Sequence, residues 1–292
     1  MPKVVLMTQT RSKDFRNLNF WNSFINFKKS NKTNFELIIN NQNENSEKNT
    51  DKKISSDVLV LNTNYLSLSV ARNYLLQKAI LNFPYYDYFI FIDDDSYIYD
   101  YILLIQSLNY CKKRNFKGLI IGAIYKPNLD FINRHMKNFS TFKILSHKHH
   151  NMIMGSCICL GKECIDKNII FDSKFGLGAK FGGSEETELF FNALKNKVKI
   201  IYNPCFMVIH PPTYKNQYSF TKMYKYGQGR GAVYKKYLDE NKIGNLIHLV
   251  YGVMANLFFS FFSLALFSFS LYLLIIALSS FLDFVVDMFL TR

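Results

Sequence analysis

Short apolar runs alternate with longer amphipathic stretches through most of the chain. The short runs are rich in β-branched and aromatic residues, which is typical of buried strands, and the longer stretches carry apolar residues at helical spacing. The predicted strands cover residues 3–7, 35–40, 57–61, 88–92, 118–125, 153–160 and 198–202, and the predicted helices cover 14–28, 68–82, 99–113 and 184–196. This alternation predicts an α/β fold with a mostly parallel sheet flanked by helices.

Two segments depart from the alternation. Residues 41–53 are polar, rich in asparagine and without periodicity, so we expect a surface loop there. Residues 243–282 are packed with Phe and Leu and contain no Asp, Glu, Lys or Arg. As one straight helix this segment would be about 60 Å long, twice the roughly 30 Å hydrocarbon core of a bilayer. We therefore expect either two transmembrane helices or one span with an interfacial helix, and a buried helix of a soluble protein is the alternative.

The predicted organisation is thus a domain over 1–242 followed by membrane-anchoring helices over 243–292. The apolar run Val4–Met7 is too short for a secretory signal and is expected to form the first strand. Several cations precede the uncharged segment: Lys215, Lys222, Lys225, Arg230, Lys235, Lys236 and Lys242. They predict that this segment begins on the cytoplasmic side of the inner membrane, with the domain facing the cytoplasm.

The chain is basic, with 36 Lys+Arg against 22 Asp+Glu and a net charge of +14. Nucleic acid, anionic lipid and phosphorylated ligands all suit such a balance. No nucleic-acid-binding module or arginine-rich stripe is present in the sequence, so no nucleic-acid partner is expected. The five cysteines are an odd number without a CxxC pair, so they are expected to be reduced and mostly buried. Cys157, Cys159 and Cys164 lack the spacing of a common structural zinc site.

Three consecutive carboxylates, Asp93, Asp94 and Asp95, follow the apolar run 88–92. A sheet interior cannot solvate them, so we expect them just beyond the carboxyl end of that strand, where open α/β sheets bind ligands. Such crowded carboxylates favour a hard divalent ion such as Mg²⁺ or Mn²⁺. An acidic loop that faces water is the alternative.

The preceding segment points to a family. Ala71-Arg72-Asn73 on a helix, then an apolar strand and an Asp-x-Asp pair, resembles the nucleotide-sugar-binding half of family 2 glycosyltransferases, which have the GT-A fold. The resemblance implies that Asp95 binds the metal directly and that Asp93 contacts the metal or the donor ribose. Arg72 would lie near the donor. Because the triple Asp leaves the register ambiguous by one, Asp94 is also a candidate donor contact.

Further residues gain roles from this resemblance. A small-residue stretch at Gly155 would lie beside the donor sugar. Glu185 and Glu186 match the family's Glu-Asp motif, in which the second acid is the general base, so Glu186 is the candidate and Glu185 the alternative. Helix capping by Ser184 and acids of the first turn would also explain this segment. His210 ends an apolar run where many GT-A enzymes place a third metal ligand, although a hydrogen-bonded structural histidine fits equally.

The strand ends and the basic stretch complete the candidate residues. Thr8 and Asn40, at the ends of the first two expected strands, are candidate donor contacts, although the family commonly has an Asp near the second position. The stretch Tyr224–Gly231 resembles one found in membrane-linked members of the family. Lys225 and Arg230 within it could bind an acceptor or phosphate, and a flexible linker is the alternative.

Together these features predict a metal-dependent inverting glycosyltransferase with Mn²⁺ or Mg²⁺. It would move a single sugar from a nucleotide-diphosphate sugar to a lipid-linked glycan acceptor for a surface polysaccharide or lipooligosaccharide. The Gln-x-x-Arg-Trp signature of processive synthases is absent from the sequence. A nucleotidyltransferase is one alternative, although residues 8–13 contain no glycine for a phosphate loop. A non-catalytic, membrane-tethered sugar-binding protein is another.

Overall fold

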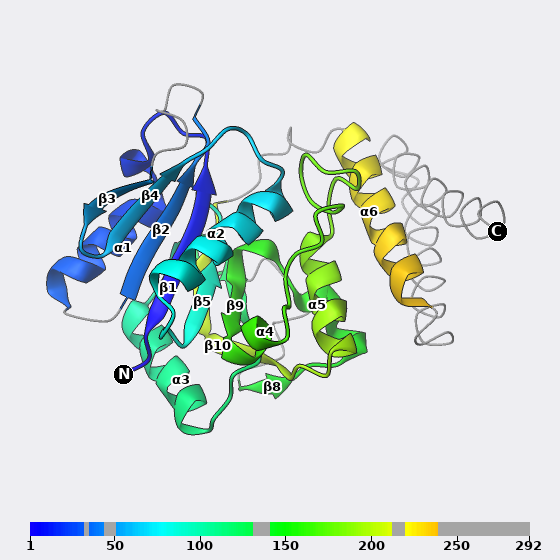
Figure 1. Cartoon of the computed structure of the whole chain (residues 1–292). Coiled ribbons are helices and arrows are strands. Elements are labelled where there is room, and N and C mark those ends of the chain that lie inside the picture. Colours follow the sequence, from blue (N-terminus) through cyan, green and yellow to red (C-terminus); the bar gives the residue numbers. More distant parts are fainter. Residues whose placement is uncertain (32–34, 44–50, 131–140, 212–219, 239–292) are drawn as a thin grey trace. The chain divides into compact units, whose positions relative to one another are not determined.

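The computed structural model describes residues 1–31, 35–43, 51–130, 141–211 and 220–238 (Figure 1). Two compact units divide the chain. The first comprises residues 1–171 and 189–212, and the second comprises residues 172–188 and the chain from 213 onward.

The first unit contains one sheet. Its strands are, in spatial order, β3 (Asp51–Ser55), β4 (Val58–Asn62), β2 (Phe35–Asn41), β1 (Val4–Thr10), β5 (Tyr88–Phe91), β9 (Ile158–Gly161), β7 (Leu119–Tyr125), β10 (Ile200–Ile209) and β6 (Tyr97–Ile98), with β8 (Lys143–Ile144) also paired to β10. Strands β4, β2, β1 and β5 are parallel neighbours, so their carboxyl ends meet at one edge. Asp93, Asp94 and Asp95 lie at this edge, because they follow β5.

The expectation of a mostly parallel sheet holds for β4, β2, β1 and β5 and for β7 with β10, and it is wrong for the other strand pairs. Strand β9 runs antiparallel to both β5 and β7, and β3, β6 and β8 are also antiparallel to their partners. The sheet is therefore mixed. A short apolar run has the same composition in either orientation when both faces are buried, so the sequence of β9 did not reveal its direction.

Helices cover both faces of the sheet. Helix α2 (Leu68–Asn82) packs on β1, β2 and β5 and crosses in front of these strands in Figure 1. Helices α1 (Asn19–Ser30) and α3 (Tyr101–Lys113) meet through the stacked rings of Phe27 and Tyr101, whose centroids are 4.4 Å apart. Both rings also contact Phe35 of β2.

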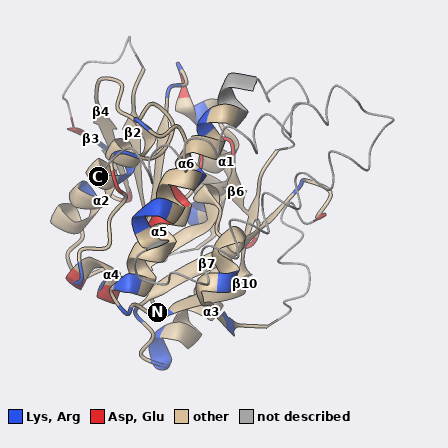
Figure 2. Cartoon of the chain, turned by 90° about the vertical axis from the view of Figure 1, so that its right-hand side faces the viewer, with Lys and Arg blue, Asp and Glu red and all other residues tan. Residues whose placement is uncertain are grey.

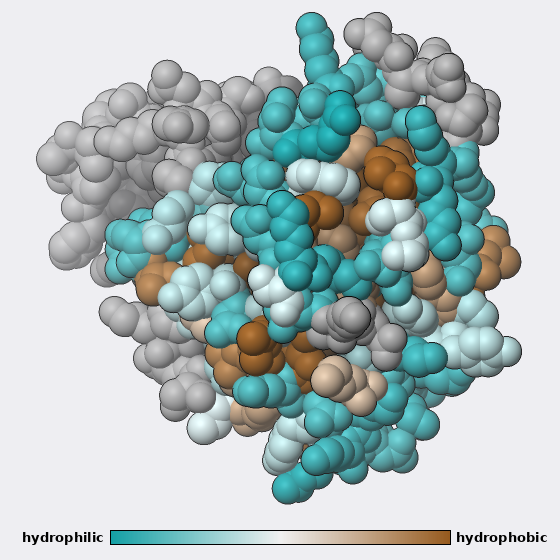
Figure 3. Space-filling view, turned by 90° about the vertical axis from the view of Figure 1, so that its left-hand side faces the viewer, coloured by the Kyte–Doolittle hydropathy of each residue, from teal (hydrophilic) through white to brown (hydrophobic). Residues whose placement is uncertain are grey.

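The core lies between these layers. Side chains of β1 and β5 such as Leu6, Met7 and Ile90 are fully buried, as are Phe20 and Phe24 of α1. On the face shown in Figure 3, hydrophilic residues cover most of the surface and hydrophobic residues gather in separate patches. The apolar strands are thus buried between the two helical layers.

Several predicted elements have different bounds. Residues 51–55, partly assigned to a loop, form the edge strand β3, whose side chains are all exposed and so show no apolar alternation. The apolar runs that begin at Val198 and Val208 both contribute to the single strand β10, Ile200–Ile209, which has a register shift between Tyr202 and Met207. The first part of the expected helix 14–28 is a separate 3-10 turn at Phe15–Asn17. The run at 153–160 begins with another such turn, Gly155–Cys157, before β9.

The second unit contains the loop from Asp172 to Ser184, the first turn of α5 (Glu185–Lys195) and helix α6 (Phe220–Leu238). Figure 2 marks the acids of α5 in red and the lysines and arginine of α6 in blue. In the part of the chain that the structure describes, no helix has the length and apolarity to cross a membrane. The expected anchor over 243–292 lies outside the described residues.

The buried sheet predicts a large cost for truncating a central side chain. Leu6→Ala should lower the free energy of unfolding by about 2–5 kcal/mol, because Leu6 is fully buried between the helical layers. Leu81→Ala on α2, where the leucine is 69% exposed, should change it by less than about 0.5 kcal/mol. Urea unfolding followed by circular dichroism measures both values. Equal losses in the two variants would contradict the placement of β1 at the sheet centre.

Candidate functional site

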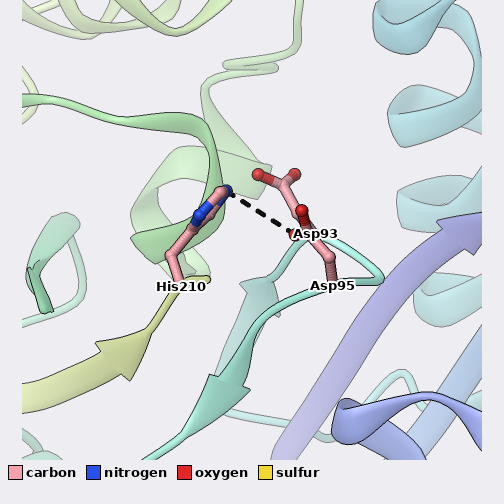
Figure 4. A group of neighbouring side chains, drawn as sticks. All are labelled: Asp93, Asp95 and His210. Atoms are coloured by element: carbon pink, nitrogen blue, oxygen red, sulfur yellow. Dashed lines mark ion pairs between the residues drawn. The ribbon is translucent and has the colours of Figure 1, made fainter. Parts of the chain in front are cut away.

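Two loops bring the strongest candidate residues together. Asp93 and Asp95 follow β5, and His210 directly follows β10. Figure 4 shows their side chains converging, with the His210 ring directed at Asp95. One ligand atom from each residue lies within 4.8 Å of the others. Among the described residues this is the one group of histidine, cysteine and acidic side chains with metal-binding geometry.

The chemistry of the three side chains fits a divalent cation. The Nδ1 atom of His210 lies 2.7 Å from the carbonyl oxygen of Pro211, which can only accept, so Nδ1 carries the proton and donates. In the neutral ring, Nε2 then presents a lone pair to the Asp95 carboxylate at 3.6 Å. Two lone-pair donors that face each other are stabilised by a shared proton or by a cation between them. An octahedral ion with ligands at about 2.1 Å separates them by roughly 3–4.2 Å, which small side-chain rotations would reach here.

Arg72 holds one of these carboxylates. Its guanidinium is 2% exposed and donates from Nη2 to Asp93 at 3.0 Å and to the Gly155 carbonyl oxygen at 3.3 Å. Its other face covers the ring of Phe171 at 5.2 Å. A Cβ atom on Gly155 would lie 2.8 Å from Nη2, so the missing side chain makes room for the arginine. The candidate donor residues Arg72, Asp93 and Gly155 therefore form one contact set.

The adjacent Asn73 explains the rest of the Ala-Arg-Asn motif. Its amide nitrogen donates to the Phe171 carbonyl oxygen at 2.7 Å, and its amide oxygen accepts from the Phe171 nitrogen at 3.0 Å. This pair fixes the segment that supplies the ring beneath Arg72. Asn73 thus supports the site through the backbone.

Asp94 differs from its two neighbours. Its carboxylate accepts a 2.6 Å hydrogen bond from the Thr10 hydroxyl at the end of β1. Burial raises the pKa of Asp94, the Thr10 hydrogen bond opposes this, and the charges of Asp95 and Asp93 raise the pKa further. Asp94 therefore contacts the end of β1 and is not part of the convergent set of Asp93, Asp95 and His210. Thr10 was not predicted. It lies two residues beyond Thr8, on the same face of the strand, and this spacing was a signal for it.

A second group of polar side chains lies at the carboxyl ends of β1 and β2. Thr8, Asn40 and Gln42 are buried, and their Oγ1, Nδ2 and Nε2 atoms have no hydrogen-bond partner among the described residues. The amide oxygen of Asn40 accepts from the Thr63 hydroxyl at 2.8 Å, which leaves its amino group free to donate. Leaving such groups buried and unpaired costs about 1–3 kcal/mol each, so a polar ligand that paired with them would recover that free energy. Thr8 and Asn40 were candidate donor contacts from the sequence, and Gln42, which has the same unpaired burial, was not among the candidates.

The acid pair lies in the second unit. Ser184 precedes α5 with a φ of 67°, a left-handed conformation that is uncommon for a residue with a side chain. Its carbonyl oxygen accepts the Glu188 N–H, so it occupies the expected N-cap position. Glu185 is buried and Glu186 is half-buried, both in the first turn. Glu186 is therefore the more accessible acid of the pair.

The glycine-rich stretch Tyr224–Gly231 is part of α6, so its interpretation as a flexible linker is wrong. Lys225 and Arg230 are exposed on this helix. Close backbone approach holds for Gly229, where a Cβ atom would lie 2.5 Å from the Gly183 carbonyl oxygen.

The cysteines show no sign of reactivity. All five are free, and four of them are buried. Burial raises the pKa of Cys164 to about 12 and that of Cys111 to about 11, so both stay protonated near neutral pH. They belong to the core.

Comparison with solved structures identifies the fold. The 1–349 portion of S. aureus TarS aligns with a TM-score of 0.56 at 12% identity, covering 81% of this chain and 65% of that one. The same portion in complex with UDP-GlcNAc gives 0.55 at 12% identity, covering 81% and 66%. The mannosyltransferase PcManGT from Pyrobaculum calidifontis, solved with GDP-Man and Mn²⁺, gives 0.58 at 10% identity and covers 100% of this chain and 88% of that one. Neither a protein-family model nor a curated protein sequence matches the chain.

These likenesses confirm the expected GT-A-like fold of a sheet flanked by helices, and the sheet is mixed where a mostly parallel one was expected. The chain spans about two thirds of the TarS portion it matches, 65% of its length. At such identities the likeness establishes the arrangement of the backbone. The chemistry must be argued from this chain's own side chains.

The convergent triad predicts divalent-ion binding. Asp95→Asn and His210→Ala should each weaken Mn²⁺ binding by at least about tenfold, because each removes one of three ligands. Electron paramagnetic resonance of free Mn²⁺ measures the affinity. Asp166→Asn is the matched control, since Asp166 is exposed at the end of the short helix α4 (Lys162–Asp166). Unchanged affinity in both site variants, or an equal loss in the control, would contradict the assignment.

Proposed function

We propose that this chain is a metal-dependent glycosyltransferase that moves one sugar from a nucleotide-diphosphate sugar to an acceptor hydroxyl. The observation that carries the proposal is the triad Asp93, Asp95 and His210 at the carboxyl edge of the sheet. The fold shared with PcManGT, which was solved with GDP-Man and Mn²⁺, supports it. TarS, solved with UDP-GlcNAc, supports a sugar nucleotide as the donor class.

The donor side of the site follows from the contacts. Mn²⁺ or Mg²⁺ held by the triad would neutralise the negative charge that develops on the leaving diphosphate. Arg72 keeps Asp93 in place and adds a buried positive charge at the same edge. Gly155, whose missing side chain makes room for that guanidinium, lies at the same place and would face the donor sugar. Asp94, held by Thr10, shapes the loop between the two ligands.

The nucleoside end of the donor would lie on the unpaired polar groups at the ends of β1 and β2. The amino groups of Asn40 and Gln42 can donate to ring or carbonyl acceptors of a base, and Thr8 supplies a hydroxyl. Burial makes such pairing selective. A base that cannot hydrogen-bond to these groups leaves them without a partner and away from water, so it binds less tightly.

Glu186 would act as the general base, with Glu185 as the alternative. It would accept the proton of the acceptor hydroxyl while the acceptor oxygen forms its bond to the anomeric carbon. The bond from that carbon to the diphosphate oxygen breaks, and its electron pair leaves with the diphosphate. A single direct displacement inverts the anomeric centre.

The acceptor is proposed to be a lipid-linked glycan used for a surface polysaccharide or lipooligosaccharide. The 40 uncharged residues at 243–282 would hold the enzyme at the inner membrane, with the domain 1–242 facing the cytoplasm. Lys225 and Arg230 on α6 precede this segment and are exposed, so they could bind an acceptor phosphate.

Neutralising the proposed base should abolish turnover without loss of donor binding. Glu186→Gln should lower kcat by about 10²–10⁴-fold and change the KM for the nucleotide sugar by less than about threefold, since it removes proton transfer alone. Release of nucleoside diphosphate in the presence of Mn²⁺ measures both constants. Glu163→Gln on α4 removes a comparable charge away from the acid pair and should have no effect.

Retained turnover in Glu186→Gln together with lost turnover in Glu185→Gln would transfer the role to Glu185. Retention in both variants would exclude a general base in this turn.

Chelation of divalent ions should stop turnover in the unmodified chain, and activity that persists in a chelator would contradict the metal dependence.

Arg230→Ala should weaken transfer to a lipid-linked acceptor by about tenfold while leaving donor hydrolysis nearly unchanged, because a phosphate pairs with the guanidinium. Lys162→Ala, at an exposed lysine of α4, is the control for loss of one charge. Truncation after Lys242 should release the protein from membrane vesicles. Membrane binding by the truncated chain, or preference for a soluble acceptor at equal concentration, would contradict this part of the proposal.

A further inference from the structure

Helix α6 contacts the loop before the acid pair at close range. A Cβ atom on Gly229 would lie 2.5 Å from the Gly183 carbonyl oxygen, so helix and loop backbones touch. The Tyr226 ring closes on Gly183 in the same way, at 2.6 Å from the position a Cβ would take. Lys225 covers Gly182. These contacts fix the residues that directly precede Ser184.

The same helix contacts α5 one turn beyond the acid pair. The fully buried Glu188 accepts two 2.7 Å hydrogen bonds on Oε1, from Lys236 Nζ and from the Tyr237 hydroxyl. Lys236 also donates to Asp172 at 2.8 Å and lies over the ring of Phe175 at 6.0 Å. Both contact regions belong to the second unit.

Glu185 and Glu186 therefore lie between two attachments to one helix, Gly183 on one side and Glu188 on the other. The turn between them is strained, because Ser184 adopts a positive φ, which persists only where the surroundings enforce it. The contacts of α6 on both sides supply that enforcement.

The choice of a charged anchor supports a role in orientation. The Oε2 atom of Glu188 is buried without a hydrogen-bond partner among the described residues. Burying a carboxylate oxygen without a hydrogen bond costs free energy, which a well-packed apolar side chain would avoid. An ion pair at this position is therefore a poor way to stabilise the fold. Its directional hydrogen bonds, by contrast, specify the rotation of the first turn of α5.

We propose that α6 is the positioning element of the acid pair, with Gly229, Glu188, Lys236 and Tyr237 as positioning residues. They act through the backbone of residues 183–188 and do not touch substrate. The inference rests on the proposed function, since it assigns a role relative to Glu186 as the base.

The test separates positioning from donor binding. Gly229→Ala and Tyr237→Phe should lower kcat by at least about tenfold, because a displacement of about 1 Å in a reacting group can cost a hundredfold. The KM for the nucleotide sugar and the affinity for Mn²⁺ should stay within about twofold, since both depend on Asp93, Asp95 and His210. Gly231→Ala is the matched control. It lies two residues along α6, where the side chain points to a different face, and alanine favours a helix.

The outcomes distinguish the inference from its premise. Full kcat in Tyr237→Phe and in a folded Gly229→Ala, with Glu186→Gln inactive, would overturn the positioning role alone. An unmodified chain that turns over no nucleotide sugar with Mn²⁺ would overturn the proposed function as well. Should Gly229→Ala fail to fold, Tyr237→Phe still decides, because it removes one hydroxyl from a helix otherwise unchanged. A parallel rise in KM and loss of Mn²⁺ binding in Tyr237→Phe would also contradict the inference.

Discussion

The crowding of three carboxylates at the end of a buried strand is the constraint on which the candidate site depends. Strand β5 lies between β1 and β9 with both faces covered, so Asp93 to Asp95 must leave the sheet at its carboxyl edge. Each of the three carboxylates then has a different partner side chain. Arg72 meets Asp93, Thr10 meets Asp94, and His210 faces Asp95. The separation of their roles follows from these three partners.

Local sequence predicted the elements that bear this edge. Helix α2 has the predicted bounds, 68–82, because its apolar pattern is uninterrupted and Pro84 blocks extension. The triad was also predicted, since strand ends in an α/β fold meet at one edge. Its assembly required His210 to reach that edge from a strand more than a hundred residues away, which the resemblance to a family supplied and the apolar pattern did not.

What the sequence could not predict depends on pairing. The direction of β9 is invisible in a run buried on both faces, and β3 has exposed side chains without alternation. The Thr10–Asp94 bond joins residues 84 apart, and Glu188 meets Lys236 across 48 residues. In each case the two polar residues do not stand out in the local sequence, and only the tertiary fold brings them into contact. The unpaired amides of Asn40 and Gln42 likewise became informative only once their burial was known.

The discontinuity of the second unit has a consequence for biosynthesis. Domains begin to fold from the amino terminus while the chain is still being made. Once His210 has left the ribosome, every strand of the sheet and every member of the metal triad is present. The turn with Glu185 and Glu186 must wait for Lys236 and Tyr237, because these residues hold Glu188. A nascent chain therefore completes its candidate metal-binding edge before its acid pair, and the two halves of the candidate chemistry form in sequence order.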